Sequence, residues 1–307
     1  MKKKLFLGPL IITMLLSTSL FAEHECSDGS NCKNSNTPTD MLGRFDKTRD
    51  LYLPQFDSKT DVDDIHSVAG VSTLLSDPRF AKVNFHAVAG AYGAQSGEYV
   101  PATDLFDMAF GSRWSDAHKD YETALKAVTE IVIDTLNNEG DVWIAEAGQS
   151  DFSADMVRQV KLELPGIDTR TRIHIVQHSD WNEESAAPAN LAYVKSNTNY
   201  HKIADGNFTG NGTPGLNTDS DTEWTRVTTH TTTGSYWKKA RAIANKYNGE
   251  DDRYLNDAIK AGGMDFSDTS ESCWIFGFQD IYDVSEFFDR FITFKNSKPT
   301  PSQEEQN

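Results

Sequence analysis

Short apolar runs alternate with longer amphipathic segments over residues 51–177. In the amphipathic segments, apolar residues recur at three- and four-residue spacing, which predicts helices over 63–77, 116–138 and 153–164. The apolar runs are rich in Val, Ile and aromatic residues and have the length of buried strands: LYLPQF (51–56), KVNFHAV (82–88), DVWIAEA (141–147) and RIHIVQ (172–177). This alternation predicts an α/β fold with a mostly parallel central sheet flanked by helices, although Pro54 argues against a strand in the first run.

The amino terminus has the pattern of a secretory signal peptide over residues 1–22. Three lysines precede an apolar stretch from Leu5 to roughly Leu16, which is too short to span a bilayer comfortably, and the leader ends at Ala22. Polar, low-hydrophobicity composition predicts a flexible tether over 23–45 and a flexible tail over 295–307, leaving one α/β domain over 46–294. We therefore expect a periplasmic or secreted protein with no membrane contact after cleavage of the leader.

The chain is strongly acidic. It has 46 acidic and 29 basic side chains, and losing the three lysines of the leader takes the net charge from −17 to about −20. Such a charge repels nucleic acid and anionic membranes, so we expect no nucleic-acid partner. Cys26 and Cys32 lie close enough in sequence to be bridged in an oxidising compartment, whereas Cys273 has no obvious partner. The sequence leaves oligomerisation open.

Polar segments follow all four apolar runs, and the first of them is the densest. The carboxyl ends of parallel strands meet at one rim of a sheet, so these segments are expected to form the site. The segment DSKTDVDD (57–64) holds Asp57, Asp61, Asp63 and Asp64 with a single Lys59. A hard divalent cation such as Ca²⁺ would neutralise these carboxylates. A solvated acidic turn at the positive end of the next helix explains the same residues without a metal.

An Asp-rich loop after the first strand, ending in Asp63-Asp64 and leading into a helix, resembles the amino-terminal signature of the nucleoside hydrolases. These are calcium-dependent N-ribosidases of the inosine-uridine-preferring type. Three later segments resemble the strands, glycine turns and helices that follow in that family, the last being nearest a secreted branch of undefined activity: HAVAGAYG (86–93), PATDLFDMAFG (101–111) and WIAEAGQSDFSADMVRQV (143–160). The resemblance covers roughly residues 50–180 and implies a nucleoside hydrolase-like, Rossmann-like architecture.

The same resemblance implies a calcium ion at the bottom of a pocket. The calcium-bound water would attack the anomeric carbon of a sugar or nucleoside substrate, in glycosidase chemistry. The implied metal ligands are Asp64, the backbone carbonyl of Ala147 and a late aspartate. For the late ligand, Asp268 in MDFSDTSES is the first choice and Asp280 in FQDIYD is the second.

Further residues would contact the substrate or transfer protons. Asp63 would contact the sugar hydroxyls, and Asp151 and Trp181 lie in strand-end segments that would reach the substrate. A histidine could protonate the leaving group, and His178 at the fourth strand end is chosen over His230. For either histidine alone, an ordinary surface or packing role is the more common explanation.

Lys59 is the main departure from the family pattern. It stands where the family has an aspartate that acts as metal ligand and probable base, and a cation there opposes metal binding. Asp57 or Asp61 would have to take over these catalytic roles, with Lys59 turned away or contacting the substrate. The alternative is a non-catalytic carbohydrate- or nucleoside-binding protein on the same fold, in which Lys59 Nζ lies within the carboxylate cluster. A structural or host-interaction protein is a third hypothesis.

Overall fold

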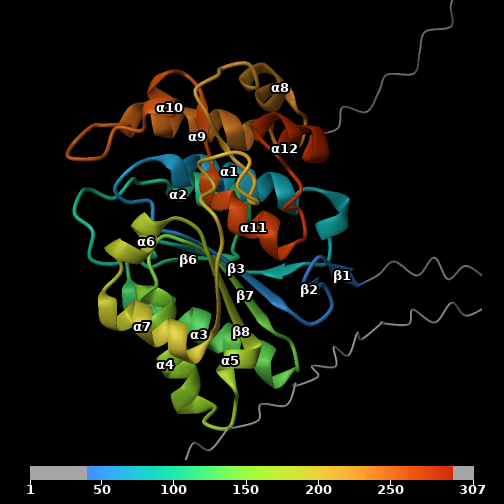
Figure 1. Cartoon of the computed structure of the whole chain (residues 1–307), viewed down its shortest axis with the longest axis vertical. Coiled ribbons are helices and arrows are strands. Elements are labelled where there is room, and N and C mark those ends of the chain that lie inside the picture. Colours follow the sequence, from blue (N-terminus) through green and yellow to red (C-terminus); the bar gives the residue numbers. More distant parts are fainter. Residues whose placement is uncertain (1–39, 293–307) are drawn as a thin grey trace, which may run out of the picture. The chain divides into compact units, whose positions relative to one another are not determined.

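A parallel sheet forms the centre of the protein, whose computed structural model describes residues 40–292. The seven strands have the order β6-β5-β3-β7-β8-β9, with β4 also paired to β3, and every pair in this sheet is parallel (Figure 1). The strands are β3 (Leu51–Phe56), β4 (Asn84–Phe85), β5 (Ala87–Ala89), β6 (Trp114–Asp116), β7 (Val142–Ala147), β8 (Ile173–Gln177) and β9 (Asn199–Lys202). The predicted α/β class with a mostly parallel sheet is confirmed.

Helices cover both faces of the sheet and bury separate apolar clusters (Figure 1). The first face carries α1 (Asp63–Leu75), α2 (Thr103–Phe110), α8 (Trp224–Thr229), α9 (Gly234–Tyr247), α11 (Ser270–Ile275) and α12 (Val284–Phe291). The second face carries α3 (Tyr121–Asn137), α4 (Asp151–Glu163) and α7 (Pro188–Asn197). The shorter elements are β1 (Met41–Leu42), β2 (Phe45–Asp46), η1 (Pro78–Phe80), α5 (Thr169–Arg172), α6 (Asp180–Ser185), β10 (Asn217–Thr218), α10 (Asp257–Lys260), β11 (Met264–Asp265) and η2 (Ser267–Thr269).

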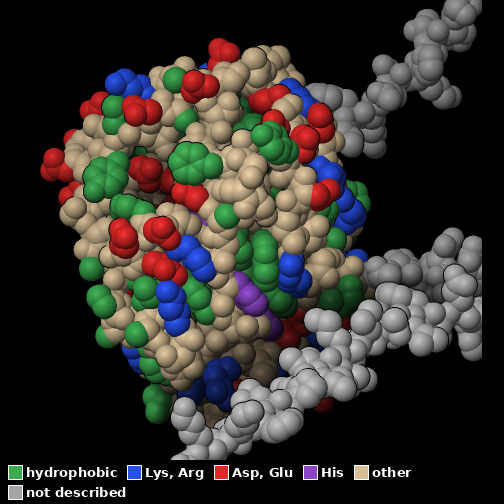
Figure 2. Space-filling view, viewed as in Figure 1, with side chains coloured by type: hydrophobic (Ala, Val, Ile, Leu, Met, Phe, Trp, Pro, Cys, Tyr) green, Lys and Arg blue, Asp and Glu red, His purple; other side chains and the backbone are tan. Residues whose placement is uncertain are grey.

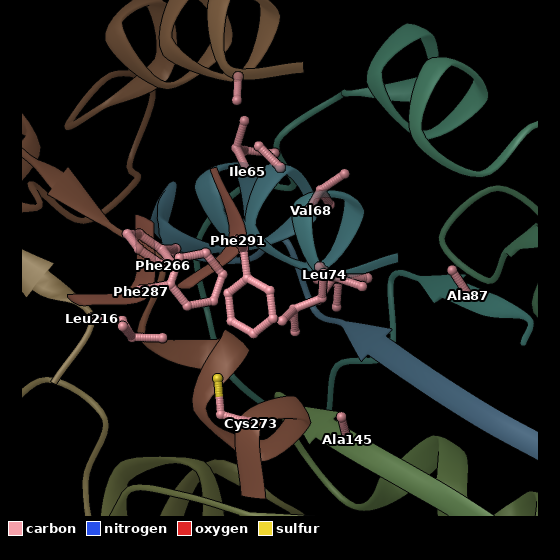
Figure 3. Close-up of a cluster of buried hydrophobic side chains, with 14 of the residues drawn as sticks. Ile65, Val68, Leu74, Ala87, Ala145, Leu216, Phe266, Cys273, Phe287 and Phe291 are labelled. Carbon is pink, nitrogen blue, oxygen red and sulfur yellow. The ribbon is translucent and has the colours of Figure 1, made fainter. Parts of the chain in front are cut away.

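The central strands are buried on both faces, which explains why their sequences are continuously apolar. Along β3, Tyr52 and Phe56 point into the first cluster, whereas Leu51 and Leu53 point into the second. Figure 3 shows part of the first cluster, where aliphatic side chains of α1 gather near phenylalanines from β11–η2 and α12. The helices predicted over 63–77, 116–138 and 153–164 correspond to α1, α3 and α4.

Pro54 lies within β3 although β3 has neighbours on both sides. The backbone of Tyr52 and Phe56 bonds toward β4 and β5, since His86 N–H donates to Tyr52 O at 3.0 Å and Ala91 N–H donates to Phe56 O at 3.1 Å. Backbone groups of alternate residues point to the same side of a strand, so the position of Pro54 also faces β4 and β5. The N–H that Pro54 lacks would point at His86, which lies between β4 and β5. A strand therefore tolerates the proline because the neighbouring strand is interrupted there.

Some boundaries differ from the sequence-based ones. Residues 41–46, assigned mostly to the tether, form the antiparallel pair β1–β2, and Phe45 is fully buried against the core. The edge strands β6 and β9 were not predicted, because WSD and NYHK are short, polar and only partly buried. The leader, the tether up to residue 39, Cys26, Cys32 and the tail lie outside the described residues. Within 40–292, no helix is long and apolar enough to cross a membrane.

Candidate metal centre

A cavity of about 960 Å³ opens beyond the carboxyl ends of β3, β7 and β8. Loops after these strands form one side of it, and residues from 207–219 and 254–268 form the other. Its lining includes eight aspartates, namely Asp57, Asp61, Asp63, Asp64, Asp219, Asp257, Asp265 and Asp268. The acidic segment 57–64 thus lies at the rim formed by the carboxyl ends of the strands, where the sequence predicted it.

Three carboxylates meet in this cavity. Oxygen atoms of Asp63, Asp64 and Asp268 all lie within 4.8 Å of one another, so the group could hold a metal ion. Asp63 and Asp64 begin α1, whereas Asp268 comes from η2, about 200 residues later. The two elements approach closely because Gly70 has no side chain: a Cβ there would lie 2.5 Å from Thr269 Oγ1.

The protein satisfies only part of the hydrogen-bonding capacity of these carboxylates. Asp64 Oδ2 accepts a short hydrogen bond from the backbone N–H of Ser58, but Asp64 Oδ1 has no partner although the residue is only 2% exposed. Asp268 Oδ2 accepts from Ser67 Oγ at 3.2 Å, and Asp268 Oδ1 lies 3.1 Å from His178 Nε2. An unpartnered, buried carboxylate oxygen is costly in an apolar interior, and a cation would compensate it.

Burial and mutual repulsion disfavour the charged form of these acids. Burial raises the pKa of Asp57 to about 7, with a further contribution from the charge of Asp268. Burial and the neighbouring carboxylates raise the pKa of Asp63 and Asp64 well above the ordinary value, and burial raises the pKa of Asp61. A bound divalent cation would favour the ionised forms and offset this cost.

Asp57 is held rigidly at the side of the metal group. Its Oδ1 accepts from the backbone N–H of Lys59 at 2.8 Å, and its Oδ2 accepts from Gln149 Nε2 at 2.9 Å and from Gln95 Nε2 at 3.2 Å. The Asp57 backbone N–H donates to the carbonyl of Ala147 at 3.1 Å, which places the end of β7 beside it. The carbonyl oxygen of Ala147 keeps a second lone pair.

Lys59 points away from the carboxylates. Its Nζ lies 4.5 Å from the centroid of the Tyr92 ring, and Lys59 does not line the cavity. Within residues 40–292, no carboxylate lies within ion-pair distance of this ammonium group. The hydrolase hypothesis expected this orientation of Lys59, but it expected Asp57 and Asp61 among the converging carboxylates, where the structure has Asp63.

Both ring nitrogens of His178 have partners inside the protein. The backbone N–H of Gly206 donates to Nδ1 at 3.0 Å, so the neutral ring carries its proton on Nε2, which faces Asp268. Burial lowers the pKa of His178, but the charges of Glu271, Asp205 and Asp268 raise it more strongly. Asp205 Oδ1, 3.5 Å from Nδ1, would partner the protonated ring. His178 therefore holds Asp268 in place.

The other predicted site residues divide into two groups. Asp61, predicted to be catalytic, and Trp181, predicted to contact the substrate, both line the cavity. Asp151 does not line it: Oδ1 accepts from Asn190 Nδ2 at 2.7 Å and Oδ2 from the backbone N–H of Ala187 at 3.2 Å, which ties the start of α7 to α4. His230 is also absent from the lining. Asp280 forms an ion pair with Arg290 at 2.9 Å on the surface, so Asp268 is the late aspartate of the metal group.

Sequence analysis missed several buried acids near the site. Glu271 lies next to His178 and accepts its backbone N–H at 3.2 Å, and burial raises the pKa of Glu271 to about 8. Asp265 accepts from two asparagine side chains in the cavity wall, and burial raises its pKa to about 7. Glu146 lies inside the apolar run of β7, and a charged residue in such a run was the available signal.

Comparison with protein-family models, curated proteins and solved structures gave no match to this chain.

Proposed function

We propose that this protein is a secreted or periplasmic hydrolase that cleaves the N-glycosidic bond of a nucleoside, or a related sugar bond, on a nucleoside hydrolase-like fold. One observation carries the proposal: Asp63, Asp64 and Asp268 converge at the cavity with an unpartnered buried oxygen on Asp64, while Lys59 faces away. A cavity of about 960 Å³ is large enough to enclose a molecule of nucleoside size.

Calcium is the proposed ion because all three side chains offer carboxylate oxygens, which hard cations prefer. The carbonyl oxygen of Ala147 is a further candidate ligand beside Asp57. Asp63, expected from the sequence to contact the sugar, is reassigned here to the metal group. When bound, such an ion supplies a Lewis acid that orients sugar hydroxyls and makes a nearby water more acidic.

Asp57 is the proposed base. Glycoside hydrolysis requires a group that takes a proton as water adds to the anomeric carbon and the glycosidic bond breaks. Three donors hold the Asp57 carboxylate beside the metal group, and a bound cation would keep this carboxylate ionised and able to accept a proton. Asp61, in the same lining, is proposed to bind sugar hydroxyls. His178 is assigned to the positioning of Asp268.

Calorimetric titration with Ca²⁺, comparing the wild type with Asp64→Asn, tests the metal centre. The substitution keeps the shape of the side chain and removes its charge, so we expect calcium affinity to fall by about 100-fold or more. Asp280→Asn is the matched control, because Asp280 is an exposed aspartate outside the cavity, and it should bind calcium like the wild type. Equal calcium binding by Asp64→Asn and the wild type would refute the site.

Activity is then measured as release of free base from nucleosides by the calcium-loaded protein. Asp57→Asn should retain calcium and lose about 100-fold or more in kcat, since it removes the proposed base. Calcium and nucleoside binding without any turnover in the wild type would instead favour the non-catalytic binding protein.

A further inference from the structure

The wall of the cavity carries more negative charge than one metal ion can balance. Besides the metal group and Asp57, the lining contains Asp61, Asp219, Asp257 and Asp265, and it contains no Lys or Arg. Among residues 40–292, none of these four aspartates has an ion-pair partner within 4.0 Å. A divalent cation offsets at most two carboxylates of the metal group, so the exposed Asp219 and Asp257 keep a negative charge that attracts a further cation.

Two aromatic side chains stand at the mouth of the same cavity. Trp181 of α6 is 40% exposed, and Tyr254, just before α10, is 55% exposed. Their ring centroids are 6.4 Å apart with an interplanar angle of 70°. Asp219 and Asp257 are exposed members of the same lining, and Figure 2 shows acidic and large apolar side chains together on the surface between α6 and α10. Aromatic faces beside carboxylates are a favourable environment for a planar cation.

The inner end and the mouth of the cavity differ, and each suits a different part of a glycoside substrate. Asp64, 98% buried with its unpartnered Oδ1, marks the inner end, where the metal group would hold the sugar. If the sugar binds there, its aglycone, which is the group attached through the glycosidic bond, lies near Trp181 and Tyr254. The charge excess and the exposed rings therefore act on the aglycone and not on the sugar.

The leaving group follows from the same arrangement. Departure of a neutral base requires a proton, but His178, the histidine of the lining, has both ring nitrogens bonded within the protein. An aglycone bonded through a cationic ring nitrogen needs no proton. The C–N electron pair returns to that nitrogen, which leaves as a neutral heteroaromatic molecule. Water adds to the anomeric carbon, and its proton passes to the Asp57 carboxylate and then to solvent.

We infer that the preferred substrate is a glycoside with a planar heteroaromatic cation as aglycone, of the N-ribosylpyridinium class. This inference rests on the proposed function and specifies its substrate. Trp181, Tyr254, Asp219 and Asp257 form the subsite for the aglycone, by ring stacking and charge.

Binding of a probe without a glycosidic bond tests the subsite independently of turnover. The calcium-loaded protein is titrated with 1-methylnicotinamide, a planar pyridinium cation, and with neutral nicotinamide, while tryptophan fluorescence and heat are followed. The cation should bind at least tenfold more tightly, and the difference should shrink at high salt because the surface charges are screened. Equal binding of the two compounds, or binding of neither, overturns the inference.

Three variants locate the subsite. Trp181→Ala should weaken binding of the cation about two- to fivefold, as expected for an exposed cation–π contact, and Trp181→Phe should restore most of it. Asp257→Asn should weaken the binding only at low salt. Asp280→Asn, the exposed aspartate outside the cavity, should have no effect. An effect of Asp280→Asn as large as that of Asp257→Asn would overturn the assignment, because it would show a response to net charge alone.

Hydrolysis distinguishes failure of the inference from failure of the proposed function. The pyridinium nucleoside nicotinamide riboside should have a kcat/KM at least tenfold above that of inosine. Faster or equal hydrolysis of inosine would overturn the inference and leave the hydrolase intact. Binding of 1-methylnicotinamide without hydrolysis of either nucleoside would refute the proposed reaction and retain only the cation-binding subsite.

Discussion

Two groups of polar side chains lie at the carboxyl end of the same strands, one open to the cavity and one closed. The open group consists of Asp63, Asp64 and Asp268, which lines the cavity. The closed group is a row formed by Gln55, Glu146 and Gln177. Gln55 of β3 pairs with Glu146 of β7, and the Gln177 side chain of β8 donates to Glu146. All three are at most 1% exposed and do not line the cavity.

Four of the six side-chain polar atoms in the closed row have partners, whereas Gln55 Nε2 and Glu146 Oε1 have none. Glu146 Oε2 accepts from Ser150 Oγ at 2.7 Å and from Gln177 Nε2 at 3.0 Å, and Gln55 Oε1 accepts from Ser153 Oγ at 3.2 Å. The row contains one carboxyl group among amides and hydroxyls, whereas the open group contains three carboxylates. This difference in charge favours a structural role for the row at the sheet edge, whereas the open group could hold a cation.

Asp268→Asn gives the largest expected effect on calcium binding. It removes one of three metal-binding carboxylates but keeps an oxygen for His178 Nε2. Calcium affinity should fall by about 100-fold, or about 2.7 kcal/mol. Glu146→Gln, in the closed row, should bind calcium like the wild type in the same calorimetric titration. Comparable losses in both variants would erase the distinction between the two groups.

Glu146→Gln should change stability and not calcium binding. Burial raises the pKa of Glu146 from 4.5 to about 7. Between these values the unfolded chain has released a proton that the folded protein keeps, so this residue lowers stability as pH rises from 4.5 to 7. The glutamine variant should lack this loss and be more stable by up to about 3 kcal/mol above pH 7.

Urea unfolding from pH 4 to pH 8, with and without calcium, measures this effect. Calcium should diminish the loss of unfolding free energy with rising pH that arises from the open group. It should leave the loss that arises from Glu146 unchanged. A variant that tracks the wild type across the whole pH range would contradict a neutral, buried Glu146.

Gly70→Ala tests the contact that assembles the open group. The new Cβ would lie 2.5 Å from Thr269 Oγ1 and 3.1 Å from Phe266 Cδ2, so the Thr269 side chain must rotate or η2 must move away from α1. We expect a loss of about 1–3 kcal/mol in unfolding free energy, as for overpacking in a core, together with weaker calcium binding. Gly166→Ala is the matched control, because a Cβ at Gly166 meets nothing within 4 Å. Unaltered calcium affinity in Gly70→Ala would show that Asp268 does not depend on this approach.

Lys59→Met gives the smallest expected effect. Lys59 Nζ lies over the Tyr92 ring and not among the carboxylates, so its removal should change calcium affinity by less than about twofold, or about 0.4 kcal/mol. A tenfold gain in calcium affinity would show that the ammonium group competes with the metal, as in the non-catalytic hypothesis.

Sequence patterns were sufficient where the structure depends on neighbours along the chain. The four apolar runs contain β3, β4 with β5, β7 and β8, and the acidic segment 57–64 lies at the predicted rim. Patterns failed for β6 and β9, since an edge strand needs no apolar periodicity. They also could not decide between Asp268 and Asp280, which lie twelve residues apart in similarly acidic surroundings.

The sequence by itself determined the alternation of strands and helices, because burial on two faces imposes apolar runs of recognisable length and spacing. The tertiary structure alone decided the chemistry of the site. It brought Asp268 of η2 against Asp63 and Asp64 of α1, directed Lys59 toward Tyr92, and placed Trp181 opposite Tyr254. These relations join residues distant in sequence, and they depend on close approaches such as that at Gly70, which no local pattern encodes.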